Sequence, residues 1–319
     1  MQTVVVGAGA MGSLLAGRMV AAGEPVTLLG RPSPHLDAIR THGLTVEELD
    51  GSHQNVKIPL AVEPDVARTA DLIVVLVKTY ATTDAIGSLK AHLSNAAVVL
   101  TLQNGLGNAS ALRAILNPSG RGAREILTGV TTEAAFREKP GVIIHAGRGQ
   151  TVIGREGGGA SPRTGKVVGH LTKSGWPSKA VVDIDRWIWR KLAINAAINP
   201  LTALTGRTNA AIADDPYLWS AAKGLAGEAA AVAAARGHDL GDIARAVADV
   251  ARATGENRSS MLADLDLGIR TEIDAINGAV VQEGRRLGVS VAANQLALSL
   301  VSLREQEIAE AAHDRSPRT

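Results

Sequence analysis

Short runs of consecutive apolar residues, separated by helix-like segments, dominate the first 180 residues of the chain. The runs cover residues 2–6, 25–29, 71–77 and 97–102, and a helical stretch lies near 81–92. Unbroken apolar runs between helices are typical of parallel strands that are buried on both faces. We therefore predict a doubly wound α/β domain over residues 1–180. Two later runs, at 142–145 and 150–154, are expected to add strands to the same sheet.

The rest of the chain follows a helical pattern. The β-rich runs stop near residue 183, and alanine-rich stretches with helical periodicity cover residues 185–199, 215–236, 240–253, 272–287 and 292–311. We predict a helical second domain over 181–312 and a frayed polar tail over 313–319. The alanine-rich stretch at 225–235 could either pair with a second copy of the chain or fill the core of its own domain.

A glycine motif follows the first apolar run. Residues 7–12 read G-A-G-A-M-G, the G-x-G-x-x-G pattern, and a helical pattern begins directly after it. The first glycine allows a tight turn, the second lets a pyrophosphate approach, and the third lets helix and strand pack closely, while the helix N-terminus offers N–H groups. The predicted dinucleotide-binding residues are Gly7, Gly9, Ala10, Met11 and Gly12. The alternative is a glycine-rich turn in an unrelated α/β protein, which the strand before the motif and the helix after it disfavour.

The end of the second predicted strand indicates which dinucleotide binds. NAD enzymes usually place an acidic residue there to bond the ribose 2′-hydroxyl, but this chain has Gly30 followed by Arg31. An acid would repel a 2′-phosphate, whereas Gly30 leaves room and Arg31 offers paired N–H donors. We therefore predict NADP(H) as the cofactor. The alternative is that Arg31 is an ordinary solvated loop residue.

Composition excludes several classes of protein. The 319 residues contain no cysteine, which rules out disulfides, thiolate metal sites and thiol nucleophiles and favours a reducing compartment. The eight histidines lack metal-ligand spacing, so no metal is expected. The formal net charge is only +2 with scattered charges, which argues against nucleic acid as a partner. No secretion signal or membrane-spanning stretch is recognisable, so we expect a cytoplasmic protein without membrane contact.

The predicted helix over residues 185–199 carries a polar stripe. Lys191, Asn195 and Asn199 recur at i, i+4 and i+8 and therefore share one face of an otherwise apolar segment. Buried asparagine is costly without partners, so the stripe must face water, a polar network or a ligand cavity. Lys191 could reach the surface, and the asparagines could bond backbone groups. Beside a ketone undergoing reduction, however, a lysine ammonium can donate a proton and stabilise the developing alkoxide.

Four parts of the chain together resemble the ketopantoate reductase (2-dehydropantoate 2-reductase) family. These parts are 7–12 with Arg31; 77–79 with 102–105; 190–195 with 199–203; and 256–262 with 271–278. The resemblance spans essentially the whole chain. It implies a Rossmann-type domain followed by an all-α domain like the C-terminal domain of 6-phosphogluconate dehydrogenase. It also implies NADPH-dependent reduction of ketopantoate to pantoate, for pantothenate and coenzyme A synthesis, by a homodimer.

The resemblance also implies roles for individual residues. Lys191 matches the family's general acid, and Glu272 matches the glutamate that organises the site. Lys78 and Asn104 match residues at the cofactor and the reacting end. The residues matching the family's substrate-binding set are Asn104, Asn195, Asn199, Asn209, Asn257 and Ser260. The residues alone leave other readings open: Glu272 could complement a helix dipole, and Ser259 and Ser260 could be helix caps.

Three other functions remain open on the sequence. A paralogue could reduce another small 2-oxo acid or an imine, because the residues that select the substrate are not identifiable from one chain. A non-catalytic NADP(H) sensor would bind the nucleotide without turnover, and the intact set of Lys191, Asn195, Asn199 and Glu272 counts against it. A hydroxy-acid enzyme like 6-phosphogluconate dehydrogenase would have a glycine-rich segment before the lysine, but residues 187–190 are Trp-Ile-Trp-Arg.

Overall fold

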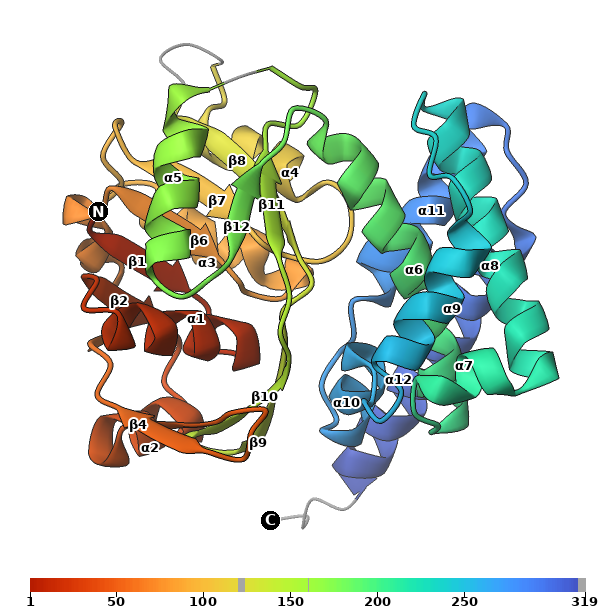
Figure 1. Cartoon of the computed structure of the whole chain (residues 1–319), viewed down its shortest axis with the longest axis horizontal. Coiled ribbons are helices and arrows are strands. Elements are labelled where there is room, and N and C mark those ends of the chain that lie inside the picture. The colour runs from red at the N-terminus through yellow and green to blue at the C-terminus, as the bar shows by residue number, and fades with distance from the viewer. Residues whose placement is uncertain (120–123, 160, 315–319) are drawn as a thin grey trace. The chain divides into compact units, whose positions relative to one another are not determined.

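The computed structural model describes residues 1–119, 124–159 and 161–314 (Figure 1). The chain forms two compact units. Unit 1 comprises Met1–Gln103 and Gly107–Ile184, and unit 2 comprises Asn104–Leu106 and the chain from Asp185 onward. An α/β unit with a largely parallel sheet thus precedes a helical unit, which confirms the predicted fold class. Of the predicted tail, residues 315–319 lie outside the described residues.

Unit 1 is built on an eight-stranded sheet in the order β12-β11-β8-β7-β6-β1-β2-β5. Its strands are β1 (Thr3–Val6), β2 (Val26–Leu29), β5 (Leu60–Ala61), β6 (Leu72–Val75), β7 (Val98–Thr101), β8 (Ile126–Thr131), β11 (Thr151–Gly154) and β12 (Ser178–Ala180). Neighbouring strands pair in parallel, except for the antiparallel pair β11 and β8. This arrangement brings the carboxyl ends of β1, β2, β6 and β7 to one edge of the sheet.

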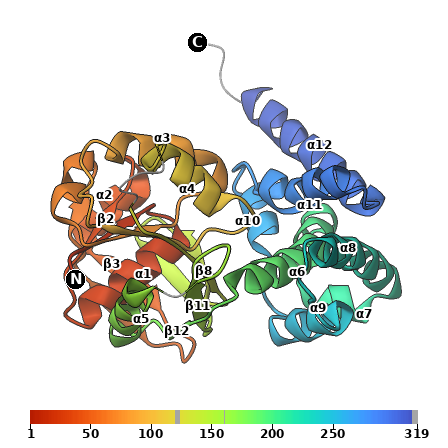
Figure 2. The same ribbon diagram turned by 90° about the horizontal axis from the view of Figure 1, so that it is seen from above.

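Helices cover both faces of this sheet. Alternate strand residues point to opposite sides, so Val5 packs with α1 (Ala10–Ala21) and α5 (Pro162–Lys173). The other face packs with α3 (Thr82–Leu89) and α4 (Asn108–Leu116), as Figure 2 shows. Every residue of the central strands β1, β6 and β7 is buried. This two-sided burial explains the unbroken apolar runs in the sequence.

A second, four-stranded sheet in the order β4-β3-β10-β9 was not expected from the sequence. Its strands are β3 (Leu44–Glu47), β4 (His53–Val56), β9 (Ala134–Lys139) and β10 (Val142–Gly147). The prediction that 142–145 extends the main sheet is wrong, because β10 pairs with β3 and β9 instead. The prediction for 150–154 is confirmed by β11. An apolar run predicts a strand, but it does not name the strand's partner.

The remaining elements of unit 1 are short. They are α2 (Pro34–His42) and two 3-10 helices, η1 (Pro64–Thr69) and η2 (Thr79–Ala81). Ser33 caps α2 by accepting a hydrogen bond from the Leu36 backbone N–H at 3.3 Å. The predicted second strand therefore leads through Gly30 and Arg31 into a capped helix.

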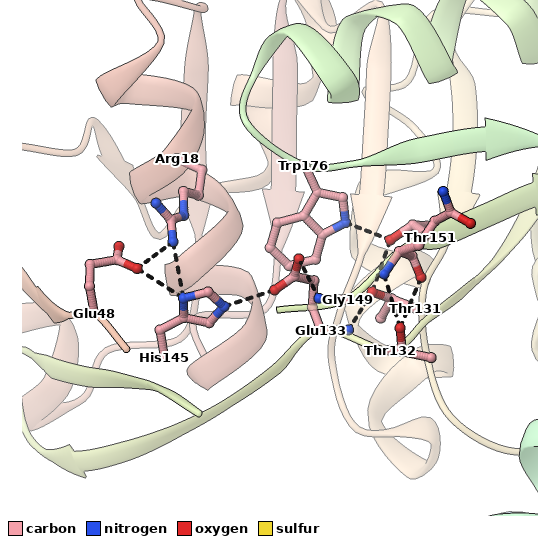
Figure 3. A network of polar contacts seen from close by, with 10 residues as sticks. Arg18, Glu48, Thr131, Thr132, Glu133, His145, Gly149, Thr151 and Trp176 are labelled. Atoms are coloured by element: carbon pink, nitrogen blue, oxygen red, sulfur yellow. Dashed lines mark hydrogen bonds and ion pairs between the residues drawn. The ribbon is translucent and has the colours of Figure 1, made fainter. Parts of the chain in front are cut away.

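A buried chain of polar side chains joins α1 to the second sheet (Figure 3). Arg18 of α1 donates to Glu48 Oε2 at 2.6 Å, and the same oxygen lies 2.9 Å from His145 Nδ1. His145 Nε2 lies 2.9 Å from Glu133 Oε2. The contacts continue into the main sheet through Gly149, Thr131, Thr151 and Trp176. Because β10 carries His145, this chain fixes the second sheet against α1.

The charges in this chain depend on one another. The hydrogen bond to Glu133 raises the pKa of His145, and Glu48 acts in the same direction although burial opposes both. Burial raises the pKa of Glu48, but hydrogen bonds from His145 and Arg18 outweigh it and leave that pKa lower than usual. Folding therefore favours the protonated imidazole of His145 and the ionised carboxylate of Glu48.

Unit 2 is helical in the part that the structure describes, and its helices surround one apolar core. They are α6 (Ile184–Thr205), α7 (Ala210–Asp214), α8 (Pro216–Ala235), α9 (Ile243–Ala253), α10 (Ser260–Asp266), α11 (Ile273–Leu287) and α12 (Ala292–Asp314). The sequence did not predict the short helices α7 and α10. Within 225–235, the buried core residues are Leu225, Ala226, Ala229, Val232 and Ala233, which favours the core-filling interpretation of this stretch. None of the described helices is both long and apolar enough to cross a lipid bilayer.

We predict that His145→Gln destabilises the protein by about 3 kcal/mol, because two buried carboxylates lose a cationic partner. The pKa of His145 is raised on folding, so its contribution is complete below about pH 6.5 and is lost as the pH rises through the folded-state value. In thermal unfolding between pH 5.5 and 9, the difference in Tm between wild type and variant should become smaller as the pH rises. His53→Gln is the control, because His53 is an exposed histidine 4.0 Å from Glu47. A gap independent of pH would contradict the charge assignment.

Candidate active site

The glycine turn between β1 and α1 has no space for side chains at two positions. Gly7 has φ +117°, and a Cβ there would lie 2.7 Å from the Val77 backbone nitrogen. A Cβ on Gly12 would lie 1.9 Å from the Gly7 carbonyl oxygen. Both residues must be glycine for the strand, the turn and the helix to meet.

Gly9 is different, because a Cβ there would meet no atom within 4 Å. Gly9 is exposed and stands at the N-cap of α1 without a side-chain cap, and the first turn contains no acidic residue. The backbone N–H groups at this helix N-terminus are therefore accessible to an anion. This open space at the start of a helix fits the pyrophosphate of a dinucleotide.

The structure corrects the interpretation of Gly30 as a source of room. A Cβ on Gly30 would lie 2.7 Å from Ala8 Cβ and 3.1 Å from Leu36 Cδ1, so close packing requires this glycine. Close packing thus excludes an acidic side chain at this position, whichever dinucleotide binds. Arg31 is exposed and forms no ion pair with any other described residue. Its guanidinium is available to a 2′-phosphate.

Lys78 lies in the loop after β6, next to the glycine turn. It is half-buried, and its carbonyl accepts a hydrogen bond from the backbone N–H of Ala81, the last residue of η2. Gln103, which follows β7, donates through Nε2 to the Val77 carbonyl at 2.9 Å and to Thr82 Oγ1 at 2.7 Å. Gln103 was not among the predicted site residues, although its position directly after an apolar strand was the available signal. It fixes the loop that carries Lys78.

Lys191 is a cation of unit 2 with a strongly lowered pKa. It projects from α6, is half-buried, and is followed by the buried residues Leu192 and Ala193. Burial lowers the pKa of Lys191 to about 8, and the negative charge of Glu272 partly opposes this shift. An ammonium with a pKa near neutrality is a suitable general acid, since it can give up its proton and regain it at physiological pH.

Glu272 directly precedes α11, and its carboxylate does not cap that helix. Thr271 Oγ1 accepts the hydrogen bond from the Ile273 backbone N–H at 3.1 Å instead. Glu272 is 7% exposed, and its Oε2 accepts a hydrogen bond from Asn104 Nδ2 at 3.4 Å. The structure therefore brings three predicted site residues together: the carboxylate of Glu272, the amide of Asn104 and the ammonium whose pKa Glu272 affects.

The segment that carries Asn104 is anchored to α11. The Leu106 backbone N–H donates to the Ala275 carbonyl at 3.2 Å. Gly105 has φ +85°, and a Cβ there would lie 2.5 Å from the same carbonyl oxygen. The glycine after Asn104 is therefore needed for this close approach. It lets the segment reach the first turn of α11, which directly follows Glu272.

Asn195 and Asn199 lie one and two turns after Lys191 on the same helix. Asn195 is half-buried and Asn199 is 5% exposed. The prediction that the helix ends at residue 199 is wrong, because α6 continues through Pro200 to Thr205. The Ala196 carbonyl, which Pro200 leaves without a helical N–H donor, accepts a hydrogen bond from the side chain of Asn277.

The other predicted substrate residues lie around the connection between α9 and α10. Asn209 donates through Nδ2 to Thr254 Oγ1 at 2.9 Å and through its backbone N–H to the Asn257 carbonyl at 3.0 Å. Asn209 Oδ1 is buried without a hydrogen-bond partner among the described residues. Ser260 is exposed at the start of α10.

Of the two serines considered as helix caps, Ser259 has that role. Its Oγ accepts hydrogen bonds from the Leu262 backbone N–H at 3.1 Å and from Thr202 Oγ1 at 2.7 Å. Because Thr202 belongs to α6, this cap also ties α10 to the helix that carries Lys191. Ser260 does not cap α10.

Comparison with known proteins gives full-length matches. The 2-dehydropantoate 2-reductase of Halobacterium salinarum is 36% identical, over 96% of this chain and 100% of its own. A crystal structure of a PanE/ApbA family ketopantoate reductase from Ralstonia eutropha has a TM-score of 0.87 and 32% identity, covering 97% of this chain and 100% of its own. A D-mandelate dehydrogenase bound to NADH and anilino(oxo)acetate has a TM-score of 0.88 at 24% identity, over 97% and 100%, which shows a shared fold.

Two family models match consecutive parts of the chain. The model of ketopantoate reductase PanE/ApbA covers residues 3–158, and the model of its C-terminal domain covers residues 183–305. Together they span both units and include the glycine turn, Lys191 and Glu272. The chain belongs to the ketopantoate reductase PanE/ApbA family of oxidoreductases.

Proposed function

We propose that this protein reduces 2-dehydropantoate to pantoate with NADPH, as a step of pantothenate and coenzyme A synthesis. The observation that carries the proposal is the half-buried Lys191, whose pKa is near 8 and responds to Glu272, in a chain that matches 2-dehydropantoate 2-reductases over its full length. In unit 1, the open N-terminus of α1 and the exposed Arg31 support binding of a nicotinamide dinucleotide phosphate.

The proposed cofactor site draws on backbone N–H groups and cationic or amide side chains. Its residues are Gly7, Gly9, Ala10, Met11, Gly12, Arg31, Lys78 and Asn104. When bound, the reduced nicotinamide supplies the hydride for the C2 carbonyl. Arg31 would pair with the 2′-phosphate, and the first turn of α1 would bond the pyrophosphate.

Lys191 would act as the general acid. Reduction of the carbonyl creates negative charge on the C2 oxygen. The Lys191 ammonium donates a proton to that oxygen and becomes a neutral amine. Glu272 favours the charged form of Lys191 before the reaction, and Asn104 holds the Glu272 carboxylate. The groups proposed to bind the carboxylate and hydroxyl of the substrate are Asn104, Asn195, Asn199, Asn209, Asn257 and Ser260.

Reduction of another small 2-oxo acid or an imine is the second candidate. It would use the same acid and carboxylate, because the shared chemistry is proton donation to a reduced carbonyl or imine. A non-catalytic NADP(H) sensor has no need of the lowered pKa of Lys191 and is therefore disfavoured. Assembly as a homodimer and residence in the cytoplasm stay predictions.

A substrate panel tests the proposed function. NADPH oxidation, followed by its absorbance with purified protein, should be fastest with 2-dehydropantoate among small 2-oxo acids, and pantoate should be the product. A faster rate with another 2-oxo acid or an imine would favour the second candidate. NADPH binding without turnover on any member of the panel would favour the sensor.

The pH dependence of catalysis should report Lys191. The value of kcat/KM for the oxo acid at saturating NADPH is expected to be constant below about pH 8 and to fall above it, because the ammonium is the active form. Lys191→Ala should lower kcat by about 10²–10⁴-fold and abolish this limb, with little change in NADPH affinity.

Glu272→Gln should move the same limb to lower pH, because the carboxylate raises the pKa of Lys191. Lys223→Ala is the matched control, since Lys223 is an exposed lysine of unit 2 that lies over the Trp219 ring. It should leave the pH profile unchanged. Equal losses of kcat and NADPH affinity in Lys191→Ala would show that Lys191 is structural.

Arg31 should determine the choice of cofactor. We expect Arg31→Asp to weaken NADPH binding by about 10–100-fold, the equivalent of one charge-assisted bidentate contact, while NADH binding changes little. Dissociation constants from fluorescence titration of both nucleotides would show this. The control is Arg40→Asp, which alters another exposed arginine close by in sequence, paired with Asp37 at 2.6 Å. An unchanged preference for NADPH in Arg31→Asp would remove Arg31 from the site.

A further inference from the structure

Pro200 creates a local problem inside α6. A proline has no backbone N–H, so it cannot donate to the carbonyl four residues earlier, which belongs to Ala196. Ala196 is 0% exposed, and water cannot easily supply the missing donor. An orphaned buried carbonyl would weaken the helix between Asn195 and Asn199.

Asn277 of α11 supplies the missing donor. Its Nδ2 donates to the Ala196 carbonyl at 3.0 Å, and the Asn277 side chain is fully buried. The same amide group also donates to Asn294 Oδ1 of α12 at 3.0 Å. Both N–H groups of this amide are therefore used, one on each neighbouring helix.

The contact continues as a buried polar chain through unit 2. Asn294 donates through Nδ2 to the Leu225 carbonyl at 3.1 Å and to Glu228 Oε2 at 2.8 Å, both on α8. The Glu228 carboxylate also accepts the backbone N–H groups of Ala293 and Asn294 at 2.9 Å, at the start of α12. Asn277 is thus bonded to α12 as well as to α6, and its partner Asn294 is in turn bonded to α8.

The location of this contact connects the two segments of the proposed proton-donating pair. On α6, Ala196 lies between the two predicted substrate asparagines, five residues after Lys191. On α11, Asn277 lies five residues after Glu272. A hydrogen bond between the two helices at this point sets their relative position along both axes.

We propose that Asn277 is a positioning residue, which sets the placement of Lys191 relative to Glu272 by bonding the carbonyl that Pro200 leaves free. The inference rests on the proposed function of those two residues. The side-chain hydrogen bonds of Asn277 go to Ala196 and Asn294, not to Lys191 or Glu272. Asn277 acts on Lys191 through the backbone of α6. Rotation of the Lys191 side chain cannot compensate for a displaced backbone.

A double-mutant cycle tests the structural half of the proposal. Pro200→Ala restores a backbone N–H at position 200 that can bond the Ala196 carbonyl, so the donor of Asn277 becomes partly redundant. Asn277→Leu should therefore lower the midpoint of urea unfolding much less in the Pro200→Ala background than in the wild type. The loss of the bond to Asn294 is the same in both backgrounds and cancels in the cycle. Additive effects would overturn the proposal.

The second half is tested on Lys191 itself. The titration of its ε-carbon, followed by NMR in protein with 13C-labelled lysine and assigned with Lys191→Arg, does not require turnover. Asn277→Leu should shift the midpoint of this titration by at least about half a pH unit. Adding Pro200→Ala to Asn277→Leu should largely reverse that shift. An unchanged titration with reduced stability would make Asn277 merely structural. If Asn277→Leu does not fold, Asn277→Ser is used, whose side chain is too short to reach the Ala196 carbonyl.

Activity separates this proposal from the proposed function. In a protein that reduces a 2-oxo acid, Asn277→Leu should lower kcat about tenfold and leave the KM for NADPH unchanged. If the wild type turns over no oxo acid, the proposed function fails, while the unfolding cycle and the Lys191 titration still decide the role of Asn277. A kcat equal to that of the wild type in Asn277→Leu would overturn the proposal alone.

Discussion

The constraint behind unit 2 is the cost of holding a lysine ammonium away from water. Burial favours the neutral amine of Lys191, and a nearby carboxylate favours the ammonium, so its pKa stays near 8 rather than at either extreme. This balance depends on the placement of Glu272, which is itself held by Asn104. If the carboxylate were closer, it would raise the pKa of Lys191 and the lysine would hold its proton too tightly. If it were farther away, burial would lower that pKa further and the lysine would lose its proton. The surrounding helices therefore need defined positions, not only apolar packing.

Unit 1 meets a constraint of a different kind, since its ligand would bind mainly backbone. At Gly7, Gly12 and Gly30 a single methyl group would collide with neighbouring atoms, whereas Gly9 faces open space. Gly7, Gly12 and Gly30 are therefore required by close packing within the protein. Only Gly9 leaves room at the helix N-terminus. This division explains why a glycine pattern predicts a dinucleotide site only in its strand and helix context.

Much of this organisation is visible in the sequence. The apolar runs predicted strands β1, β2, β6, β7 and β11, and helical periodicity located α8, α9, α11 and α12 closely. The second sheet was missed because β4 is exposed and polar, so its residues leave no apolar signal. The α6 boundary was misplaced because proline usually ends a helix, and the compensating amide of Asn277 lies 77 residues away in sequence. Local patterns carry no information on such distant partners. The same holds for the Glu272 carboxylate, because its contact with Asn104 can be recognised only in the folded structure.

Proline within α6 is best understood together with the polar stripe on that helix. An interior proline costs about 3 kcal/mol through its lost hydrogen bond and its clash with the carbonyl four residues earlier. One buried hydrogen bond from Asn277 returns only about 1 kcal/mol, so the pair is not retained for stability alone. Moving the donor from the helix's own backbone to a side chain of α11 makes the geometry of α6 depend on a neighbouring helix. A regular helix would hold Asn195 and Asn199 by itself, whereas here their placement is tied to α11, the helix that directly follows Glu272.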